Sequence, residues 1–187
     1  IVFNKIDLLV DDDSSEVRQQ ELENIYSDIG YEIIKVSATT GEGIQELKES
    51  LKDGINLLSG HSGVGKSTII NSLMPGLELK TADVSESHSK GRHTTTFAEM
   101  FRIPDGGFII DTPGIKGFGL ITIDRQTLNH QFPEIFSYIS GCKFYNCVHT
   151  GEPGCAVKKA VEEGGISEER YSNYCEMYET FEEGPYR

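Results

Sequence analysis

The chain has 187 residues, of which 37% are apolar and 25% are charged, and its formal net charge is -13. These fractions are those of an ordinary globular protein, and the acidic balance argues against nucleic-acid binding through bulk charge. No apolar run approaches the length of a membrane span, so we expect no contact with a membrane.

The first predicted strand, Ile1–Phe3, runs directly into Asn4-Lys5-Ile6-Asp7. The sequence opens inside a strand and without Met, so we expect it to be a piece of a longer protein. A carboxylate such as Asp7 can accept two parallel hydrogen bonds from the N1–H and N2 amino groups of guanine, a donor pair that adenine lacks. Asn4 can contact the base or tie loops together, and the aliphatic stem of Lys5 can lie on the ring.

A helix over residues 14–28 and a strand over residues 31–36 are predicted next, from apolar spacing and from the turn signals at their ends. Ser37 and Ala38 follow the strand. Their backbone N–H groups can be offered to the guanine oxygen, although an ordinary turn fits these two residues as well. Apolar residues on one face predict a further short helix over residues 43–52.

The next strand and helix, residues 55–58 and 67–74, enclose a phosphate-loop pattern, and we expect the strand to be buried. Glycines let the backbone curl so that several N–H groups point at one phosphate, and the helix N-terminus adds positive charge. Lys66 would reach the β- and γ-phosphates and Ser67 would bind Mg²⁺; a glycine-rich turn before an ordinary helix is the alternative. The predicted nucleotide contacts of this loop are Gly60, His61, Ser62, Gly63, Val64, Gly65, Lys66, Ser67 and Thr68.

Residues 80–96 are polar, have no clear period and end in three threonines. A hydroxyl here could supply a second Mg²⁺ ligand once the γ-phosphate is bound. We take Thr95 as that ligand and Thr94 as a nucleotide contact, although any of the three threonines fits. The threonines could also simply begin the next strand, predicted over residues 97–103.

A buried strand over residues 108–110 ends in Asp111-Thr112-Pro113-Gly114. Asp111 fits the acidic residue that holds Mg²⁺, usually through water, and the N–H of Gly114 could sense the γ-phosphate. In Ras-like enzymes a Gln after this motif orients the attacking water, but the residue here is Ile115. We therefore expect His93 to take that role, because it directly precedes the threonines; a loop residue that faces solvent or a partner is the alternative. The expected catalytic residues are His93, Lys66 and Thr95.

The last quarter of the chain holds all four cysteines, and three of them lie close to a histidine. Cys142, Cys147, His149 and Cys155 form a set that binds Zn²⁺ tetrahedrally, and a closed set of this kind is structural. Scattered reduced cysteines are the alternative, and we expect Cys175 to be a separate buried thiol.

We therefore expect an α/β, P-loop GTPase-like fold with a mainly parallel sheet and flanking helices over residues 1–138. A small zinc-binding helical domain, with helices over residues 156–163 and 167–182, is expected over residues 139–187. Such a domain is too small for an independent core, so the metal would supply folding energy.

The motifs form the guanine-nucleotide signature in permuted order, because Asn4–Asp7 and Ser37–Ala38 precede Gly60–Ser67, Thr94–Thr96 and Asp111–Gly114. Such a permutation is permissible because each motif follows a parallel strand at one edge of the sheet. With the cysteines behind it, this order resembles the circularly permuted ribosome small-subunit-dependent GTPase A family (RsgA/YjeQ-like).

The resemblance implies an N-terminal OB-fold domain, which is absent from this sequence. It implies a role in late maturation of the small ribosomal subunit, with GTP hydrolysis stimulated by that subunit. It further implies GTP/GDP, Mg²⁺ and Zn²⁺ as cofactors and the small subunit and its rRNA as partners. We expect a cytoplasmic monomer that does not bind DNA.

Two rival functions remain open. A P-loop ATPase or kinase would lack the guanine preference that Asp7 predicts. A non-catalytic, nucleotide-gated RNA-binding scaffold would bind GTP without turning it over.

Overall fold

The computed structural model describes residues 1–9, 13–77, 79, 98–104, 106–111 and 125–180. The chain forms two compact units, Ile1–Phe118 and Gly119–Arg187. The boundary thus falls earlier than the expected one at residue 139. The reason is that Leu128, Phe132 and Ile135 are buried in the same core as two of the cysteines.

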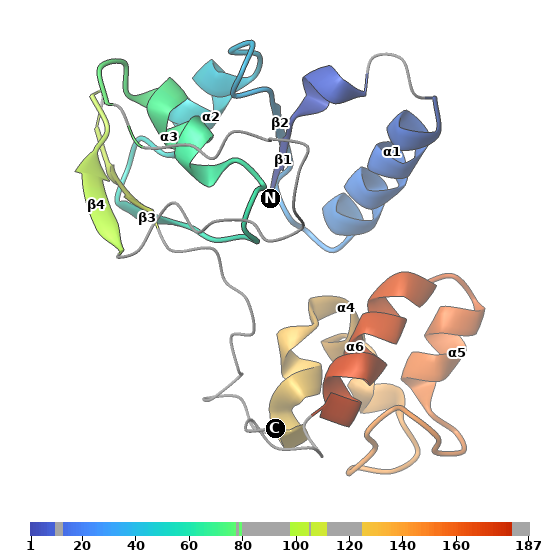
Figure 1. The fold of residues 1–187 in the computed structure, drawn as a ribbon. Coiled ribbons are helices and arrows are strands. Elements are labelled where there is room, and N and C mark those ends of the chain that lie inside the picture. Colours follow the sequence, from blue (N-terminus) through green and yellow to red (C-terminus); the bar gives the residue numbers. More distant parts are fainter. Residues whose placement is uncertain (10–12, 78, 80–97, 105, 112–124, 181–187) are drawn as a thin grey trace. The chain divides into compact units, whose positions relative to one another are not determined.

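The strands that the structure describes in the N-terminal unit form two sheets (Figure 1). Strands β1 (Val2–Asn4) and β2 (Ile34–Val36) pair in parallel. In the second sheet, β5 (Phe108–Asp111) lies between β3 (Ile55–Leu58), to which it is parallel, and β4 (Glu99–Arg102), to which it is antiparallel. The mainly parallel pairing is confirmed, but the described strands do not join in the single sheet that we expected.

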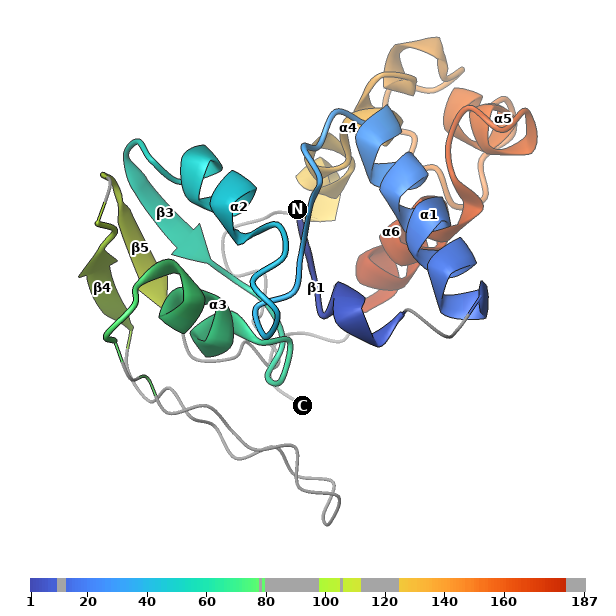
Figure 2. The same cartoon turned by 90° about the horizontal axis from the view of Figure 1, so that it is seen from above.

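Among the described residues, four helices accompany these strands: η1 (Ile6–Leu8), α1 (Asp13–Asp28), α2 (Ile44–Ser50) and α3 (Lys66–Leu73). Figure 2 shows α2 and α3 on one face of the three-stranded sheet, where their apolar sides form the core with the strands. The buried apolar residues of this core are Ile34, Val36, Ile44, Leu47, Ile69, Ile70, Leu73, Met74, Ile103 and Ile109.

The opposite face of the three-stranded sheet exposes large apolar side chains. Ile55 is 68% exposed, Leu57 63% and Met100 56%. The register pairs Ile55 with Phe108, and these side chains share a face that no described element covers. The prediction of a buried strand at residues 55–58 was therefore wrong, because only alternate residues of β3 are covered, and those only partly.

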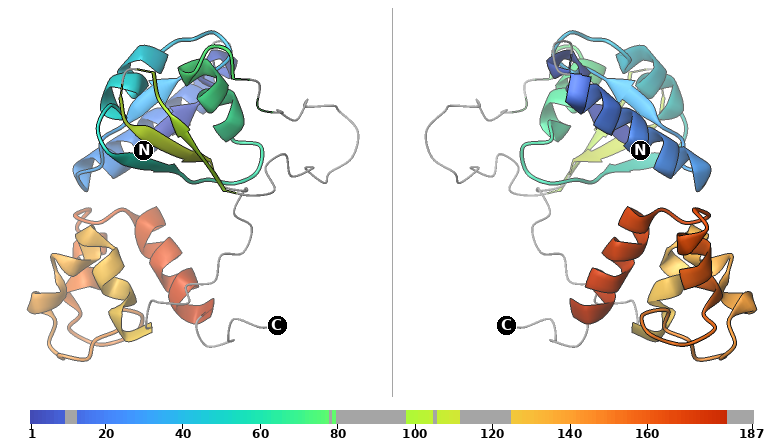
Figure 3. Two further views of the ribbon diagram at one scale, coloured as in Figure 1. Left: turned by 90° about the vertical axis from the view of Figure 1, so that its left-hand side faces the viewer. Right: turned by 90° about the vertical axis from the view of Figure 1, so that its right-hand side faces the viewer.

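The C-terminal unit is helical and is coloured yellow to red in Figure 3. It contains η2 (Arg125–Gln131), α4 (Pro133–Phe136), η3 (Ile139–Gly141), α5 (Ala156–Glu162) and α6 (Glu168–Thr180). The helix predicted over 156–163 is therefore confirmed to within one residue at its end. The helix predicted over 167–182 is confirmed from residue 168 to residue 180, and residues 181 and 182 lie outside the described part of the chain. Nε of Arg170 donates to Oε1 of Glu134 at 2.7 Å, and this largely buried ion pair ties α6 to α4.

Among the described residues, no helix combines the length and the apolar character needed to cross a bilayer.

Candidate functional site

The predicted phosphate loop lies between β3 and α3, which begins at Lys66. Gly63 and Gly65 adopt φ angles of 86° and 95°, a left-handed backbone that favours glycine. The ammonium group of Lys66 donates to the carbonyl oxygens of Gly60 at 2.7 Å and His61 at 3.0 Å. The lysine side chain therefore folds back over the loop, with its ammonium group against two of the loop's carbonyl oxygens.

Asn4 brings three of the predicted motifs together. Its Nδ2 donates to the carbonyl oxygen of Val64 at 2.9 Å, and its Oδ1 accepts from the N–H of Ala38 at 3.2 Å. Nearby, Nζ of Lys5 donates to the carbonyl oxygen of Gly63 at 2.8 Å. Asn4 thus ties loops together, which is one of the two roles that the sequence left open.

The N–H groups of Ser37 and Ala38 both have partners within the protein. Ser37 N–H donates to the carbonyl oxygen of Glu42 at 2.9 Å, whereas the N–H of Ala38 donates to Asn4. The Ala38 carbonyl oxygen accepts from the hydroxyl of Ser72 at 2.7 Å. Ser72 was missed by the sequence reasoning, since a serine within a helix carries no signal of a distant partner.

Asp7 lies in η1, directly after Lys5, whose φ is 69°. Its Oδ1 is buried and accepts no hydrogen bond from the residues that the structure describes. A carboxylate oxygen in that state can still accept an N–H from a base, as the predicted guanine recognition requires.

Ser67 and Asp111 meet at the carboxyl ends of β3 and β5. The hydroxyl of Ser67 donates to Oδ2 of Asp111 at 3.3 Å, and Asp111 is 2% exposed. Hydroxyl, carboxylate and water oxygens are the ligands that Mg²⁺ prefers, so this pair fits the ion. Four predicted site residues lie outside the described part of the chain: His93, Thr94, Thr95 and Gly114.

The four predicted zinc ligands converge in the C-terminal unit. The ligand atoms of Cys142, Cys147, His149 and Cys155 all lie within 4.8 Å of one another. Nδ1 of His149 is 3.6 Å from Sγ of Cys142 and 3.5 Å from Sγ of Cys155, and those two sulfurs are 4.0 Å apart. Tetrahedral Zn²⁺ places sulfur and nitrogen ligands about 3.6 Å apart and two sulfurs about 3.8 Å apart. The four donors therefore fit a zinc ion in chemistry, and Cys142, His149 and Cys155 also have the spacing that the ion requires.

Burial in this cluster favours the neutral forms of Cys147, His149 and Cys155. Burial raises the pKa of the Cys147 thiol to about 12 and also raises the pKa of Cys155. Burial lowers the pKa of His149. A neutral imidazole is the form that binds metals, whereas the thiols must release protons when a metal binds.

The backbone around His149 is held by α6. His149 has a φ of 63°, a conformation that costs a non-glycine residue about 1–2 kcal/mol. Its carbonyl oxygen accepts from the hydroxyl of Tyr171 at 2.6 Å, and the carbonyl oxygen of Val148 accepts from Tyr174 at 2.9 Å. The sequence reasoning missed both tyrosines, because their three-residue spacing is that of any helix face packed on a core and does not indicate contact with the cluster.

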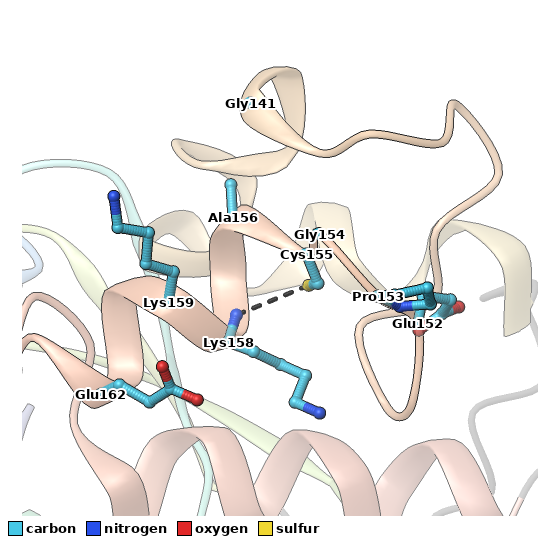
Figure 4. Close-up of a pocket in the computed structure, with 9 residues that line it drawn as sticks. All are labelled: Gly141, Glu152, Pro153, Gly154, Cys155, Ala156, Lys158, Lys159 and Glu162. Carbon is cyan, nitrogen blue, oxygen red and sulfur yellow. Dashed lines mark hydrogen bonds between the residues drawn. The ribbon is translucent and has the colours of Figure 1, made fainter.

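Cys155 is a buried member of the cluster and directly precedes α5. Its sulfur accepts a hydrogen bond from the backbone N–H of Lys158 at 3.5 Å, drawn as a dashed line in Figure 4. An open hollow borders Cys155 and is lined by Glu152, Pro153 and Lys159 among others. Cys175 is outside the cluster, and it is only partly buried, not buried as expected.

Comparisons with known proteins agree with this geometry. The family model described as RsgA GTPase matches residues 1–121. The chain is 54% identical over 187 residues to the small ribosomal subunit biogenesis GTPase RsgA of Bacteroides fragilis. It is 52% identical to RsgA 2 of Bacteroides thetaiotaomicron. Both alignments cover 100% of this chain but 60% of the relative, so the chain spans only part of the curated proteins that it matches.

Two solved structures are similar to this chain. The crystal structure of YjeQ from Thermotoga maritima has a TM-score of 0.77 and 44% identity, over 96% of this chain and 58% of that chain. The structure of YloQ, described as a circularly permuted GTPase, has a TM-score of 0.76 and 30% identity, over 100% of this chain and 58% of that chain.

Proposed function

The chain belongs to the RsgA GTPase family, and from this premise we propose that it binds and hydrolyses GTP during assembly of the small ribosomal subunit. The observation that carries the proposal is the double hydrogen bond of Asn4, which joins the predicted base-binding and phosphate-binding loops into one site. The printed names of the relatives, small ribosomal subunit biogenesis GTPases, support the biological role.

We assign the recognition of guanine to Asp7, whose Oδ1 accepts no hydrogen bond from the described residues. Asn4 and Lys5 hold the base loop against the phosphate loop. Lys66 binds the phosphates with its ammonium group, which lies over the phosphate loop and donates to the carbonyl oxygen of Gly60.

Ser67, Asp111 and Thr95 would hold Mg²⁺, and Thr95 lies outside the described residues. When bound, the ion neutralises the charge that develops on the phosphate oxygens. His93, which also lies outside the described residues, would orient the attacking water through a neutral imidazole nitrogen.

The Cys142, Cys147, His149 and Cys155 cluster is proposed to bind Zn²⁺ as a structural ion. Its ligands come from a segment with little regular structure, between η3 and α5, and a bound ion would cross-link that segment. A closed set of four protein ligands leaves no position for a substrate, so no catalytic role is assigned.

The proposed partners are the small ribosomal subunit and its rRNA, and the proposed state is a cytoplasmic monomer that binds neither DNA nor membranes. The net charge of -13 disfavours contact with RNA through bulk charge, so the contact must come from a local face or from a segment outside this chain.

The test is GTP turnover by the purified chain with and without small ribosomal subunits, beside the full-length relative from Bacteroides fragilis as a positive control. We expect slow intrinsic hydrolysis that the subunits accelerate, with ATP at equal concentration failing to compete. Tight GTP binding without turnover by this chain, under conditions in which the control protein hydrolyses GTP, would favour the scaffold alternative. Effective competition by ATP would favour the ATPase or kinase.

A further inference from the structure

The imidazole of His149 has a close contact on each side. Its Nδ1 faces the sulfurs of Cys142 and Cys155 at 3.6 and 3.5 Å. Its Nε2 lies 3.2 Å from the side-chain amide of Asn129, on helix η2. The ring is therefore placed between the ligand cluster and a neutral polar side chain from another element.

Which atom donates and which accepts between His149 and Asn129 follows from the nitrogen that binds the metal. An ion bound at Nδ1 leaves the imidazole proton on Nε2, so Nε2 becomes a hydrogen-bond donor. In the structure Nδ2 of Asn129, also a donor, faces it, while Oδ1 of Asn129 is buried and accepts no hydrogen bond from the described residues. Half a turn of the Asn129 amide exchanges these two atoms and places an acceptor opposite the Nε2 proton.

We propose that Asn129 is a positioning residue for the metal centre: its Oδ1 accepts the Nε2–H of His149 and holds the ring with Nδ1 toward the ion. The inference rests on the proposed zinc site. It extends that site beyond the four ligands to η2, whose neighbouring residue Leu128 is fully buried in the core of the C-terminal unit.

The two sides of His149 are then fixed by different elements. Helix α6 holds the backbone carbonyl through Tyr171, whereas η2 holds the ring through Asn129. Hydrogen bonds of this second kind raise the basicity of the ligating nitrogen and restrict the ring, and their loss typically weakens metal binding about 10–100-fold.

Two substitutions at Asn129 test whether the side chain acts on His149 as a hydrogen-bond acceptor or as a donor. In the full chain, Asn129→Asp keeps the acceptor oxygen, whereas Asn129→Leu keeps the approximate volume but removes both polar atoms. We expect Leu to weaken zinc binding about 10–100-fold in competition with a chromophoric chelator, and Asp to retain it. Gln131→Ala, which removes an exposed amide on the same helix, is the matched control and should leave the affinity unchanged.

Equal loss of affinity in the Asp and Leu variants would overturn the inference, because Asp can accept from Nε2 but cannot donate to it. Unchanged affinity in the Leu variant would also overturn it and would leave the zinc site intact. A wild-type chain that binds no zinc would refute the zinc site itself and this inference with it.

A measurement on the zinc-loaded wild-type chain does not depend on the folding of any variant. A ¹H–¹⁵N spectrum of the histidine rings should place the proton of His149 on Nε2, in slow exchange with water. A proton on Nδ1 would contradict both the ligating nitrogen and the role of Asn129.

Discussion

Asn4 serves two loops with one amide, because its nitrogen donates to Val64 and its oxygen accepts from Ala38. The amide of an asparagine carries a donor nitrogen and a separate acceptor oxygen on one short side chain. Aspartate would keep the contact to Ala38 and place a second acceptor against the Val64 carbonyl. The residue type at this position is therefore set by the contacts within the protein, whether or not the base also touches it.

Asp7→Asn should shift nucleotide preference from guanine toward xanthine. The carboxylate accepts two N–H groups from guanine, whereas an amide can donate one hydrogen bond to the additional oxygen of xanthine. Titration with GTP and XTP measures the shift. Asp53→Asn, at an exposed carboxylate, is the control, and unchanged GTP affinity in the Asp7 variant would remove Asp7 from the base site.

Lys66→Ala and Ser67→Ala should each abolish GTP turnover. The lysine variant should also weaken GTP binding about 10–100-fold, because hydrogen bonds to charged groups contribute about 1.5–3 kcal/mol. Turnover and equilibrium binding are measured beside Lys52→Ala, which removes an exposed lysine of the same unit. Normal hydrolysis by either site variant would contradict the assignment.

His93→Ala should lower stimulated turnover at least about tenfold, equivalent to about 1.4 kcal/mol of barrier, with GTP affinity preserved. The reason is that Ile115, at the position after Asp111–Gly114, has no hydrogen-bonding group. Single-turnover hydrolysis with saturating small subunits measures the change. If stimulated turnover survives, the water is oriented by the subunit or by a segment outside this chain.

At the scale of elements, the phosphate loop depends on glycines for two different reasons. A Cβ at Gly63 would meet nothing within 4 Å, so only its φ of 86° requires glycine. A Cβ at Gly65 would lie 2.3 Å from Nδ2 of Asn4, so this glycine also makes room for the contact between the base loop and the phosphate loop.

Gly65→Ala should therefore destabilise the N-terminal unit more than Gly63→Ala. Both substitutions add strain of about 1–2 kcal/mol, and Gly65→Ala also displaces Asn4 from Val64, a loss of about 0.5–1.5 kcal/mol. A double-mutant cycle in urea isolates the second part, because Gly65→Ala should cost less in the Asn4→Ala background. Additive effects in the cycle would show that the clash does not act through Asn4.

At the scale of the whole molecule, the two units have separate cores. The core of the N-terminal unit is built on the strands with α2 and α3, and that of the C-terminal unit includes Cys147 and Cys155 themselves. A metal bound by Cys147 and Cys155 would therefore stabilise the C-terminal unit. The contacts described for the candidate nucleotide site all lie within the N-terminal unit.

Removal of zinc should thus unfold the C-terminal unit and leave GTP binding largely intact. Structural zinc contributes about 10–16 kcal/mol in small zinc-dependent peptides, more than a small core can replace. Circular dichroism, zinc analysis and GTP titration before and after chelation test this. Cys142→Ser should likewise lose zinc and unfold the C-terminal unit, whereas the control Cys175→Ser should keep one zinc per chain. A purified wild-type chain that is folded but contains no zinc would refute the proposed zinc site.

The sequence by itself determined most of the helices and indicated the candidate site residues. Periodicity located α1, α5 and α6 because helical spacing is a local property, and the phosphate loop was recognisable because its glycines and lysine are adjacent in the chain. The four candidate zinc ligands were recognisable for the same reason, since all four lie within one short segment.

Only the tertiary structure decided which face of β3 is covered, where the two units divide, and how the site is supported. Whether Ile55 is buried depends on which elements pack on that face of the sheet, and the sequence of the strand alone does not specify those elements. The contacts of Asn4 with Val64, Ser72 with Ala38, and Asn129 with His149 join residues at least 20 positions apart. Such contacts leave no periodic trace in the sequence, because folding alone brings the partners together.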